Sequence, residues 1–528
     1  MPLPIEPLGA PTDNLPPNLG ALVRSAAERH RHTPALQFEG YDDLTFEEVG
    51  SLTAGARDAL REMGVRKGDR VLVALDNRPE YQILWLACGE AGAVFVPMNP
   101  TYGPADASHV IENSAPRAVI WLPSTHDRHA MLLPAGTSVA TVGDPRQGAA
   151  LFSLNQGDLA SLGRGVTHSD YVTLSFTSGT TGLPKGCVST QEHWLLLAKI
   201  LARGLELTDD DRLLTAQPCF YGDPQYNLVA ALWSGTHLTV LRRFRSQTFW
   251  EQVRQSRATK FWCIGTMPAM LMNTPPGATD GDHNLTAVWC VGIPRPLHGA
   301  LEERFQVRWL EAFGTSETGV NLFQALDSPA APGEGWLGDP VPYTEVRLVD
   351  QEGKVVDGDG EAYLELKTPL LFSGYWDAAQ HRVREIPRGS WFRTGDILER
   401  RGAKYRFARR EKDIVRRSGE NISCREVEEI LRKHPKIIDV AIVPRPDDIR
   451  GEEVWAFVLT EAGAAARDPS PEDIFAHASQ RLARHKVPRF LTYVEQFPMT
   501  PSERIAKHKL PDIVAEGQTY DRQEGLWM

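Results

Sequence analysis

Cysteine pairs and an export signal are both missing from this sequence of 528 residues. Its six cysteines form no Cys-x-x-Cys pair and are typical of scattered, reduced thiols. The first residues, Met-Pro-Leu-Pro-Ile-Glu, include neither the basic nor the apolar segment of a secretory signal. We therefore expect reduced thiols and a cytoplasmic protein.

Long apolar runs and an excess of basic residues are also missing. The most apolar stretch, residues 83–98, is interrupted by two glycines, a glutamate and a proline, and it falls short of a bilayer span. With 57 Lys and Arg against 68 Asp and Glu, the formal net charge is −11, which argues against a general nucleic-acid binder. We expect no membrane span and no nucleic-acid partner, and the sequence leaves a homo-oligomeric state open.

What is present is an alternation of strand and helix patterns. Residues 69–75 are typical of a buried strand, a helical pattern follows over 79–90, and a second apolar strand follows over 93–99. Such alternation predicts parallel sheets covered by helices. From residue 333 onward, short apolar runs between Asp- and Gly-rich turns indicate an antiparallel, barrel-like unit. The expected fold class is α/β, with a large N-terminal domain of two helix-covered parallel-sheet units plus the β-barrel-like unit, and a small mobile C-terminal α/β domain.

A run of five charged residues marks the expected domain boundary. Residues 409–413, Arg-Arg-Glu-Lys-Asp, lie between two apolar strands, and such a run is a good linker candidate. We expect an N-terminal domain over 1–409, a hinge over 410–413 and a C-terminal domain over 414–528.

One glycine-rich loop organises the rest of the chain. Residues 171–176 alternate and carry aromatic and β-branched side chains, so they are predicted to form a strand. Glycines let backbone N–H groups approach an anion, hydroxyls add donors and a lysine adds a positive charge, so a polyphosphate is the favoured ligand and a polar surface turn is the alternative. The loop and its lysine are Thr177, Ser178, Gly179, Thr180, Thr181, Gly182 and Lys185.

This loop resembles the phosphate loop of the adenylate-forming enzymes, a family that includes acyl-CoA synthetases, luciferases and the adenylation domains of peptide synthetases. In that family the loop holds the β- and γ-phosphates of ATP, so the resemblance implies ATP and Mg²⁺ as cofactors. The resemblance extends from about residue 21 to residue 510 in five ordered motifs. Residues 249–253, 257–259 and 418–423 are most similar to ligases of the crotonobetaine/carnitine-CoA type.

A second motif supplies a carboxylate. Residues 313–317 resemble the family's Tyr-Gly-x-Thr-Glu, although alone they could form a helix N-cap with its capping glutamate. The resemblance implies that Phe313 stacks on adenine, Ser316 meets the α-phosphate and Glu317 holds Mg²⁺. A turn at 292–294 resembles the Gly-Ala-Pro turn beside the adenine. The expected ATP-binding residues of these two segments are Gly292, Ile293, Pro294, Phe313, Gly314, Thr315, Ser316 and Glu317.

Two further motifs concern the ribose and the hinge. Residues 391–396 include Thr-Gly-Asp, and the family's aspartate accepts both ribose hydroxyls, as two carboxylate oxygens can, so we expect Asp396 in this role. By the same resemblance, Arg410 contacts the ribose and phosphate. Lys412 is the hinge residue and Gly419 leaves room for the pantetheine arm in a CoA channel. The alternatives are a Gly–Asp β-turn and a solvated charged face.

The expected acid pocket lies at residues 217–223, Gln-Pro-Cys-Phe-Tyr-Gly-Asp, which resemble the family's Pro-x-Phe-His segment. Tyr221 replaces the histidine and Asp223 follows two residues later. We expect both to line the pocket, although aromatic residues beside proline usually only pack.

One departure from the family concerns its catalytic lysine. The family has Pro-x-Thr-x-x-Gly-Lys, whose lysine reaches the carboxylate and the α-phosphate, whereas residues 498–504 read Pro-Met-Thr-Pro-Ser-Glu-Arg. Arg504 keeps the charge but is bulkier and planar. Three accounts stay open: Arg504 takes the role, Lys507 or Lys509 takes it, or the acid needs less help. The candidate catalytic residues are therefore Lys185, Glu317, Arg504 and Lys507.

The resemblance implies an AMP-forming acid–thiol ligase. A carboxylate attacks the α-phosphorus of Mg·ATP to give acyl-AMP and pyrophosphate, and a thiol, with CoA as the expected acceptor, then displaces AMP. Positioning and charge neutralisation are the protein's main contribution. Two alternatives stay open: adenylation of an unusual small acid such as nitrite with an amine as acceptor, and a catalytically weak or silent nucleotide-binding protein.

Overall fold

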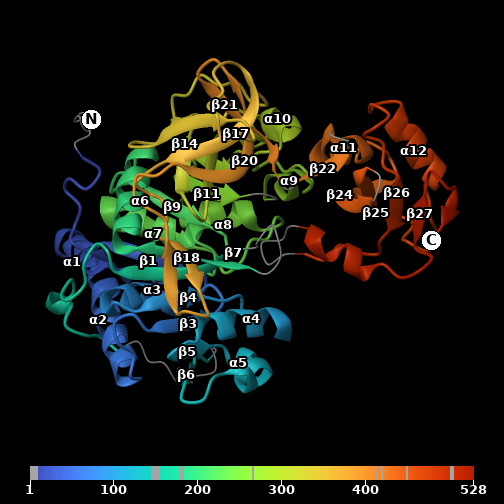
Figure 1. The fold of residues 1–528 in the computed structure, drawn as a ribbon. Coiled ribbons are helices and arrows are strands. Elements are labelled where there is room, and N and C mark those ends of the chain that lie inside the picture. The colour runs from blue at the N-terminus through green and yellow to red at the C-terminus, as the bar shows by residue number, and fades with distance from the viewer. Residues whose placement is uncertain are drawn as a thin grey trace.

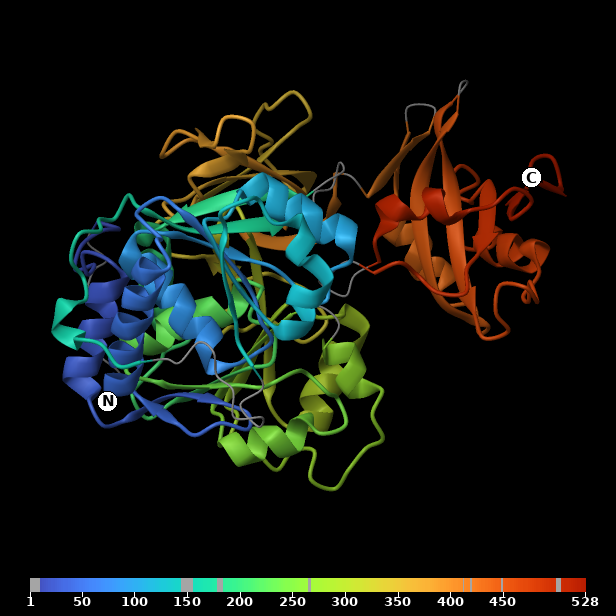
Figure 2. The same ribbon diagram turned by 90° about the horizontal axis from the view of Figure 1, so that it is seen from below.

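The chain folds into one large body and a small domain set to one side of it, which is coloured red in Figures 1 and 2. The structure, a computed structural model, describes residues 10–143, 155–177, 184–264, 267–411, 413–417, 420–447, 450–499 and 505–528. Among these residues no helix is both long and apolar enough to cross a membrane.

The first sheet of the large body has nine strands in the order β15-β14-β13-β12-β11-β9-β10-β1-β2. The six strands from β13 to β1 run parallel, and antiparallel strands extend the sheet at both ends. The bounds are β1 Pro34–Phe38, β2 Leu44–Thr45, β9 Arg212–Thr215, β10 His237–Val240, β11 Lys260–Ile264, β12 Ala287–Val291, β13 Arg308–Thr315, β14 Gly319–Phe323 and β15 Asp339–Pro340.

The second sheet has eight strands in the order β19-β18-β8-β7-β4-β3-β5-β6. Its five strands from β7 to β6 run parallel, and β8, β18 and β19 are antiparallel. The strand predicted over 171–176 is confirmed as β7. The bounds are β3 Arg70–Ala74, β4 Val94–Pro97, β5 Ala118–Trp121, β6 Ser138–Thr141, β7 Tyr171–Thr177, β8 Lys185–Thr190, β18 Gly374–Asp377 and β19 Arg382–Glu385.

Helices cover these sheets, as parallel strands require. The signals that start and stop them are ordinary ones: Thr45 and Glu48 form a capping box ahead of α2, and Pro79 opens α3, which ends at the left-handed Gly92. The bounds are α1 Leu19–His30, α2 Phe46–Glu62, α3 Pro79–Ala91, α4 Pro104–Ser114, α5 Pro123–His129, α6 Gln191–Gly204, α7 Asp223–Ser234, α8 Phe249–Ser256, α9 Met267–Met272 and α10 Arg295–Phe305. Short 3-10 turns are η1 Ala130–Leu132 and η3 Leu159–Ser161.

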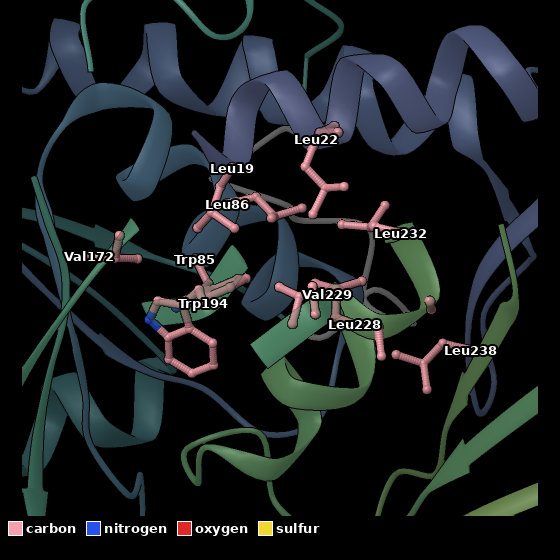
Figure 3. Close-up of a cluster of buried hydrophobic side chains, with 14 of the residues drawn as sticks. Leu19, Leu22, Trp85, Leu86, Val172, Trp194, Leu228, Val229, Leu232 and Leu238 are labelled. Atoms are coloured by element: carbon pink, nitrogen blue, oxygen red, sulfur yellow. The ribbon is translucent and has the colours of Figure 1, made fainter. Parts of the chain in front are cut away.

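The main core of the large body forms where helices α1, α3, α6 and α7 meet (Figure 3). Trp85 of α3 and Trp194 of α6 pack edge to face with ring centroids 4.8 Å apart. Leu19 of α1 and Leu232 of α7 belong to the same buried cluster. Burial of these large apolar side chains fixes the helices, and with them the strand ends that border the cavity described below.

A third sheet contains four antiparallel strands in the order β16-β17-β20-β21. The antiparallel unit predicted after residue 333 is thus a four-stranded sheet. The bounds are β16 Glu345–Val349, β17 Gly360–Lys367, β20 Phe392–Arg401 and β21 Lys404–Arg410.

The small domain has a sheet and a buried core of its own. Val427 and Leu431 of its first helix pack with Val440 and Val454 of its two long strands. The predicted α/β class is confirmed, and all six cysteines are buried and unpaired as expected. The bounds are β22 Ile414–Arg417, β23 Glu420–Ser423, α11 Cys424–Leu431, β24 Ile437–Asp447, β25 Gly451–Thr460, α12 Pro471–Ser479, β26 Phe490–Tyr493, η4 Lys507–Lys509, η5 Pro511–Ile513, β27 Thr519–Asp521 and β28 Leu526–Trp527.

Candidate active site

A cavity of about 2140 Å³ collects residues from both large sheets, from the antiparallel sheet and from the tail of the small domain. It lies at the carboxyl ends of parallel strands, since Thr177 ends β7, Ile264 ends β11 and Val291 ends β12, and all three line it. Ligands of open α/β sheets characteristically bind at this edge. The cavity is therefore the candidate active site.

The strand end and the lysine that flank the predicted phosphate loop both line this cavity. Thr177 of β7 pairs with Lys185 of β8 across an antiparallel hairpin, and the Thr177 hydroxyl donates to the Lys185 carbonyl at 3.4 Å. The Lys185 ammonium lies 5.3 Å from the ring centroid of Tyr375. The intervening predicted residues, Ser178, Gly179, Thr180, Thr181 and Gly182, lie outside the described residues.

Tyr375 links this lysine to the predicted magnesium carboxylate. Its hydroxyl donates to Glu317 Oε1 at 3.1 Å, and its strand, β18, pairs with β8. Burial and the negative charge of Glu317 raise the pKa of Tyr375, so the phenol keeps the proton that it donates. The sequence analysis missed Tyr375, because a tyrosine after Ser-Gly carries no signal that sets it apart from packing.

The turn before Glu317 brings three predicted residues to the cavity wall. Gly314, Thr315 and Ser316 line the cavity with Glu317, whose backbone N–H donates to the Thr315 hydroxyl at 3.3 Å. A Cβ on Gly314 would lie 2.3 Å from the backbone oxygen of Gly319 in the facing strand, so this position requires glycine.

Phe313, expected to stack on adenine, is turned away from the cavity. Its side chain is only 6% exposed and packs with Leu322 and Leu364 in the core between β13–β14 and the antiparallel sheet. Phe313 is not among the described residues that line the cavity. Successive side chains of a strand point to opposite faces, which accounts for its separation from its lining neighbours.

The predicted ribose carboxylate is buried and paired. Asp396 of β20 is 2% exposed, lines the cavity and lies opposite Arg410 of β21. Arg410 Nε donates to Asp396 Oδ1 at 3.0 Å. Burial raises the pKa of Asp396, and the charge of Arg410 opposes this shift. A cavity-facing carboxylate held in this way is suited to accepting hydroxyl donors.

The predicted adenine-side turn is held by a glutamate that the sequence analysis did not single out. Gly292, Ile293 and Pro294 connect β12 to α10, with Gly292 at a φ of +89°, and the Ile293 N–H donates to Glu311 Oε2 at 3.4 Å. Glu311 is 3% exposed, and burial raises its pKa to about 8, against the opposing effect of the turn's amides. A lone carboxylate inside the apolar run 309–313 was the signal available in the sequence. The turn itself does not line the cavity, although the preceding Val291 does.

The predicted acid-pocket residues lie on the cavity wall. Tyr221 precedes α7 and Asp223 is its first residue. Asp223 lies in the first turn of α7, and its Oδ1 accepts a hydrogen bond from the Trp262 indole at 3.1 Å. Tyr226 and Trp194, with rings 5.3 Å apart, complete a largely aromatic wall.

The tail of the small domain brings one lysine to the cavity and turns another away. Within the described part of the tail, Lys509 lines the cavity and Lys507 does not. Lys507 Nζ lies 2.8 Å from Oε1 of Glu428 in the small domain and 3.3 Å from Oδ1 of Asp413 in the predicted hinge. The predicted Arg504, Lys412 and Gly419 lie outside the described residues.

The donor set suits a magnesium ion that arrives with a triphosphate. Within the described ranges, no group of three or more His, Cys, Asp or Glu residues could enclose a metal ion. Mg²⁺ commonly takes one or two protein carboxylates and completes its shell with substrate phosphates and water. Glu317, on the wall beside the Lys185 hairpin, fits that single protein ligand.

Comparisons with known proteins agree with this geometry. Residues 23–376 match the family model for AMP-binding enzymes, and residues 426–504 match the model for their C-terminal domain. Crotonobetaine/carnitine–CoA ligase of Escherichia coli (strain Crooks) is 31% identical over 461 residues, which cover 83% of this chain and 87% of the relative. The ligase of the same name from Proteus mirabilis is 29% identical over 502 residues, which cover 89% of this chain and 94% of that ligase.

Solved structures show the same fold. ATP-bound MatB from Rhodopseudomonas palustris superposes with a TM-score of 0.81 at 24% identity, and o-succinylbenzoate CoA synthetase from Bacillus subtilis, in complex with OSB-AMP, with 0.79 at 21%. Each alignment covers 94% of this chain and 98% of the other. The chain therefore belongs to the family of AMP-binding, adenylate-forming enzymes, with their large N-terminal and small C-terminal domains.

Proposed function

We propose that this enzyme activates a carboxylic acid with Mg·ATP, forming acyl-AMP and pyrophosphate, and then transfers the acyl group to the thiol of CoA. The observation that carries the proposal is the gathering of Lys185, Glu317 and Asp396 around one cavity from three separate parts of the chain. A volume of about 2140 Å³ exceeds that of a drug-sized pocket and leaves room for a nucleotide together with an acid.

In the first step, an oxygen of the acid attacks the α-phosphorus while the bond to the pyrophosphate oxygen breaks. Lys185 would neutralise the phosphates and Asp396 would accept the ribose hydroxyls. Mg²⁺, when held by Glu317, would share the remaining phosphate charge. Such preorganised charges stabilise the transition state without covalent chemistry by the protein.

For the second step, we propose a hinge at residues 410–413 between a domain over 1–409 and a domain over 414–528. Arg410 is tied to Asp396 of the large body, whereas the Asp413 carbonyl accepts the Cys424 N–H at 2.8 Å in the small domain. Lys412 stays the predicted hinge residue between these two anchored ends. Gly419 stays the predicted passage for the pantetheine arm.

The acceptor is inferred from the relatives, whose names specify CoA ligation. An ATP- and CoA-dependent reaction and six unpaired, buried thiols suit the cytoplasm. The homo-oligomeric state stays open, and small-molecule acids and acceptors are the expected partners.

The proposal is tested by incubating the enzyme with Mg·ATP, CoA and a panel of short-chain, branched, aromatic and betaine acids. We expect AMP, pyrophosphate and a CoA thioester with at least one acid. A protein that binds ATP but releases no pyrophosphate with any acid would contradict adenylation. A parallel reaction with nitrite and an aryl amine examines the second acceptor class, for which pyrophosphate would form without a thioester.

A further inference from the structure

We propose that Lys509 is the cation that the small domain presents to the reacting carboxylate and the α-phosphate, and that Lys507 is a structural residue. The assignment rests on the proposed adenylation, and it concerns the position where the sequence departs from the Gly-Lys pattern. The evidence is the different surroundings of these two lysines in one short 3-10 turn, η4.

Lys507 is engaged inside the small domain. Its ammonium contacts Glu428 at 2.8 Å and Asp413 at 3.3 Å. Glu428 is fixed in turn, because its Oε1 also accepts the Ile442 N–H at 2.8 Å. To reach the cavity, Lys507 would have to abandon a nearly buried carboxylate, which carries a large penalty.

Lys509 points elsewhere because a 3-10 turn rotates by a third of a circle per residue, so side chains two positions apart leave it on different sides. It lines the cavity, together with Asp106 of α4 in the large body. Its Nζ lies 4.0 Å from Asp106 Oδ1, and both side chains are 47% exposed. In Figures 1 and 2 the red C-terminal chain reaches from the small domain toward the large body, in agreement with this contact.

The contact with Asp106 is one that a substrate could replace. Exposed ion pairs contribute little and exchange readily with other charges. Asp106 also lies in the first turn of α4, where the helix dipole stabilises a carboxylate without help from a lysine. Lys509 is therefore a cation at the cavity wall that is held only weakly by the protein.

The chemistry needs such a cation. The carboxylate and the α-phosphate are both negative and must approach until the new oxygen–phosphorus bond forms. The bond to pyrophosphate breaks as it forms, and pyrophosphate leaves with the electron pair. Only oxygen–phosphorus bonds form and break in this step, so no proton acceptor is required. A compact ammonium with three donors can contact both groups at once.

The test separates the two half-reactions. Pyrophosphate release in a single turnover with an accepted acid should fall about a hundredfold in Lys509→Ala, as expected for loss of one stabilising donor. Thioester formation from supplied acyl-AMP and CoA should be unchanged, which a misfolded small domain would not permit. Lys436→Ala, at an exposed small-domain lysine paired with Asp468, is the matched control and should retain both rates.

A rescue experiment addresses the charge itself. In a Lys509→Cys variant, 2-bromoethylamine would rebuild a lysine-like side chain at the introduced thiol, because the six native thiols are buried. We expect adenylation to recover on alkylation. Wild-type rates in Lys509→Ala, or no recovery after alkylation, would overturn the assignment of Lys509 but not the proposed function. A wild-type enzyme that releases no pyrophosphate with any acid would overturn the proposed function and this assignment with it.

Discussion

Arg410 Nε donates to Asp396 Oδ1 at 3.0 Å across the β20–β21 pair. Arg410 is the last residue of β21 and the first residue of the predicted hinge, and Asp396 is a buried carboxylate of the cavity. The contact therefore joins the predicted ribose site to the boundary between the two domains. A nucleotide that engages either residue would influence both.

Replacing Asp396 should weaken nucleotide binding. In Asp396→Ala the ribose hydroxyls lose charged acceptors worth about 1.5–3 kcal/mol, which corresponds to a decrease of tenfold or more in affinity for Mg·ATP. Isothermal titration with a non-hydrolysable ATP analogue measures this. Glu399→Ala, three residues along β20 and paired with Arg406 instead, is the control. Equal affinities in wild type and Asp396→Ala would remove Asp396 from the ribose site.

The carboxyl of Glu311 should make stability depend on pH. Its pKa is raised from 4.5 to about 8, so between these pH values the folded protein keeps a proton that the unfolded chain has released. Stability therefore falls as pH rises through this window, by a few kcal/mol in order of magnitude. Glu311→Gln keeps an acceptor for the Ile293 N–H but does not titrate. The difference between the unfolding midpoint of this variant and that of the wild type should therefore shift in favour of the variant as the pH rises from 6 to 8.5. A pH-independent difference would show that Glu311 titrates normally.

A methyl group at Gly314 should disable the site while leaving the fold intact. Its Cβ would lie 2.3 Å from the Gly319 backbone oxygen, so the β13–β14 turn must shift and carry Glu317 with it. A displacement of about 1 Å can cost roughly a hundredfold in rate. Gly299→Ala, where a Cβ meets nothing within 4 Å, is the control. Pyrophosphate release and circular dichroism should be measured together; full activity in Gly314→Ala would contradict the requirement for glycine.

Removing the Lys507 charge should destabilise the small domain. Lys507→Met leaves Arg432, 3.6 Å away, as the remaining cation of the nearly buried Glu428. Because the Lys507 side chain is 26% exposed, we expect a loss of about 1–3 kcal/mol rather than the full cost of a buried pair. Lys436→Met, which removes an exposed pair with Asp468, should leave the unfolding midpoint nearly unchanged, because exposed ion pairs contribute little to stability. Thermal unfolding monitored by hydrogen exchange of small-domain amides compares the two. Equal shifts in the unfolding midpoint of the two variants would show that the contacts of Lys507 with Glu428 and Asp413 do not stabilise the small domain.

Local patterns predicted much of this fold. The alternation at 171–176 predicted β7, and helix-sized apolar patterns predicted elements such as α3, because burial and periodicity are properties of short segments. The Thr177–Lys185 pairing and the placement of Asp396 and Glu317 on one cavity follow from the order of the strands. That order depends on contacts between distant segments and entered the sequence analysis only through a family resemblance.

The direction of individual side chains could not be predicted. Phe313 lies in a strand whose alternation directs it into the core, and a motif does not specify that face. Lys507 and Lys509 were equivalent alternatives to Arg504 in the sequence, because their partners Glu428 and Asp106 lie far away along the chain. Tyr375 became visible only when β18 was found beside β8.

We propose that Glu317 and Lys185 act on one triphosphate during acid activation. Acid-dependent exchange of labelled pyrophosphate into ATP measures that step directly, without CoA. We expect exchange in the wild type with an accepted acid, and a decrease of about a hundredfold or more in Glu317→Gln and in Lys185→Ala. Wild-type exchange rates in both variants would contradict it.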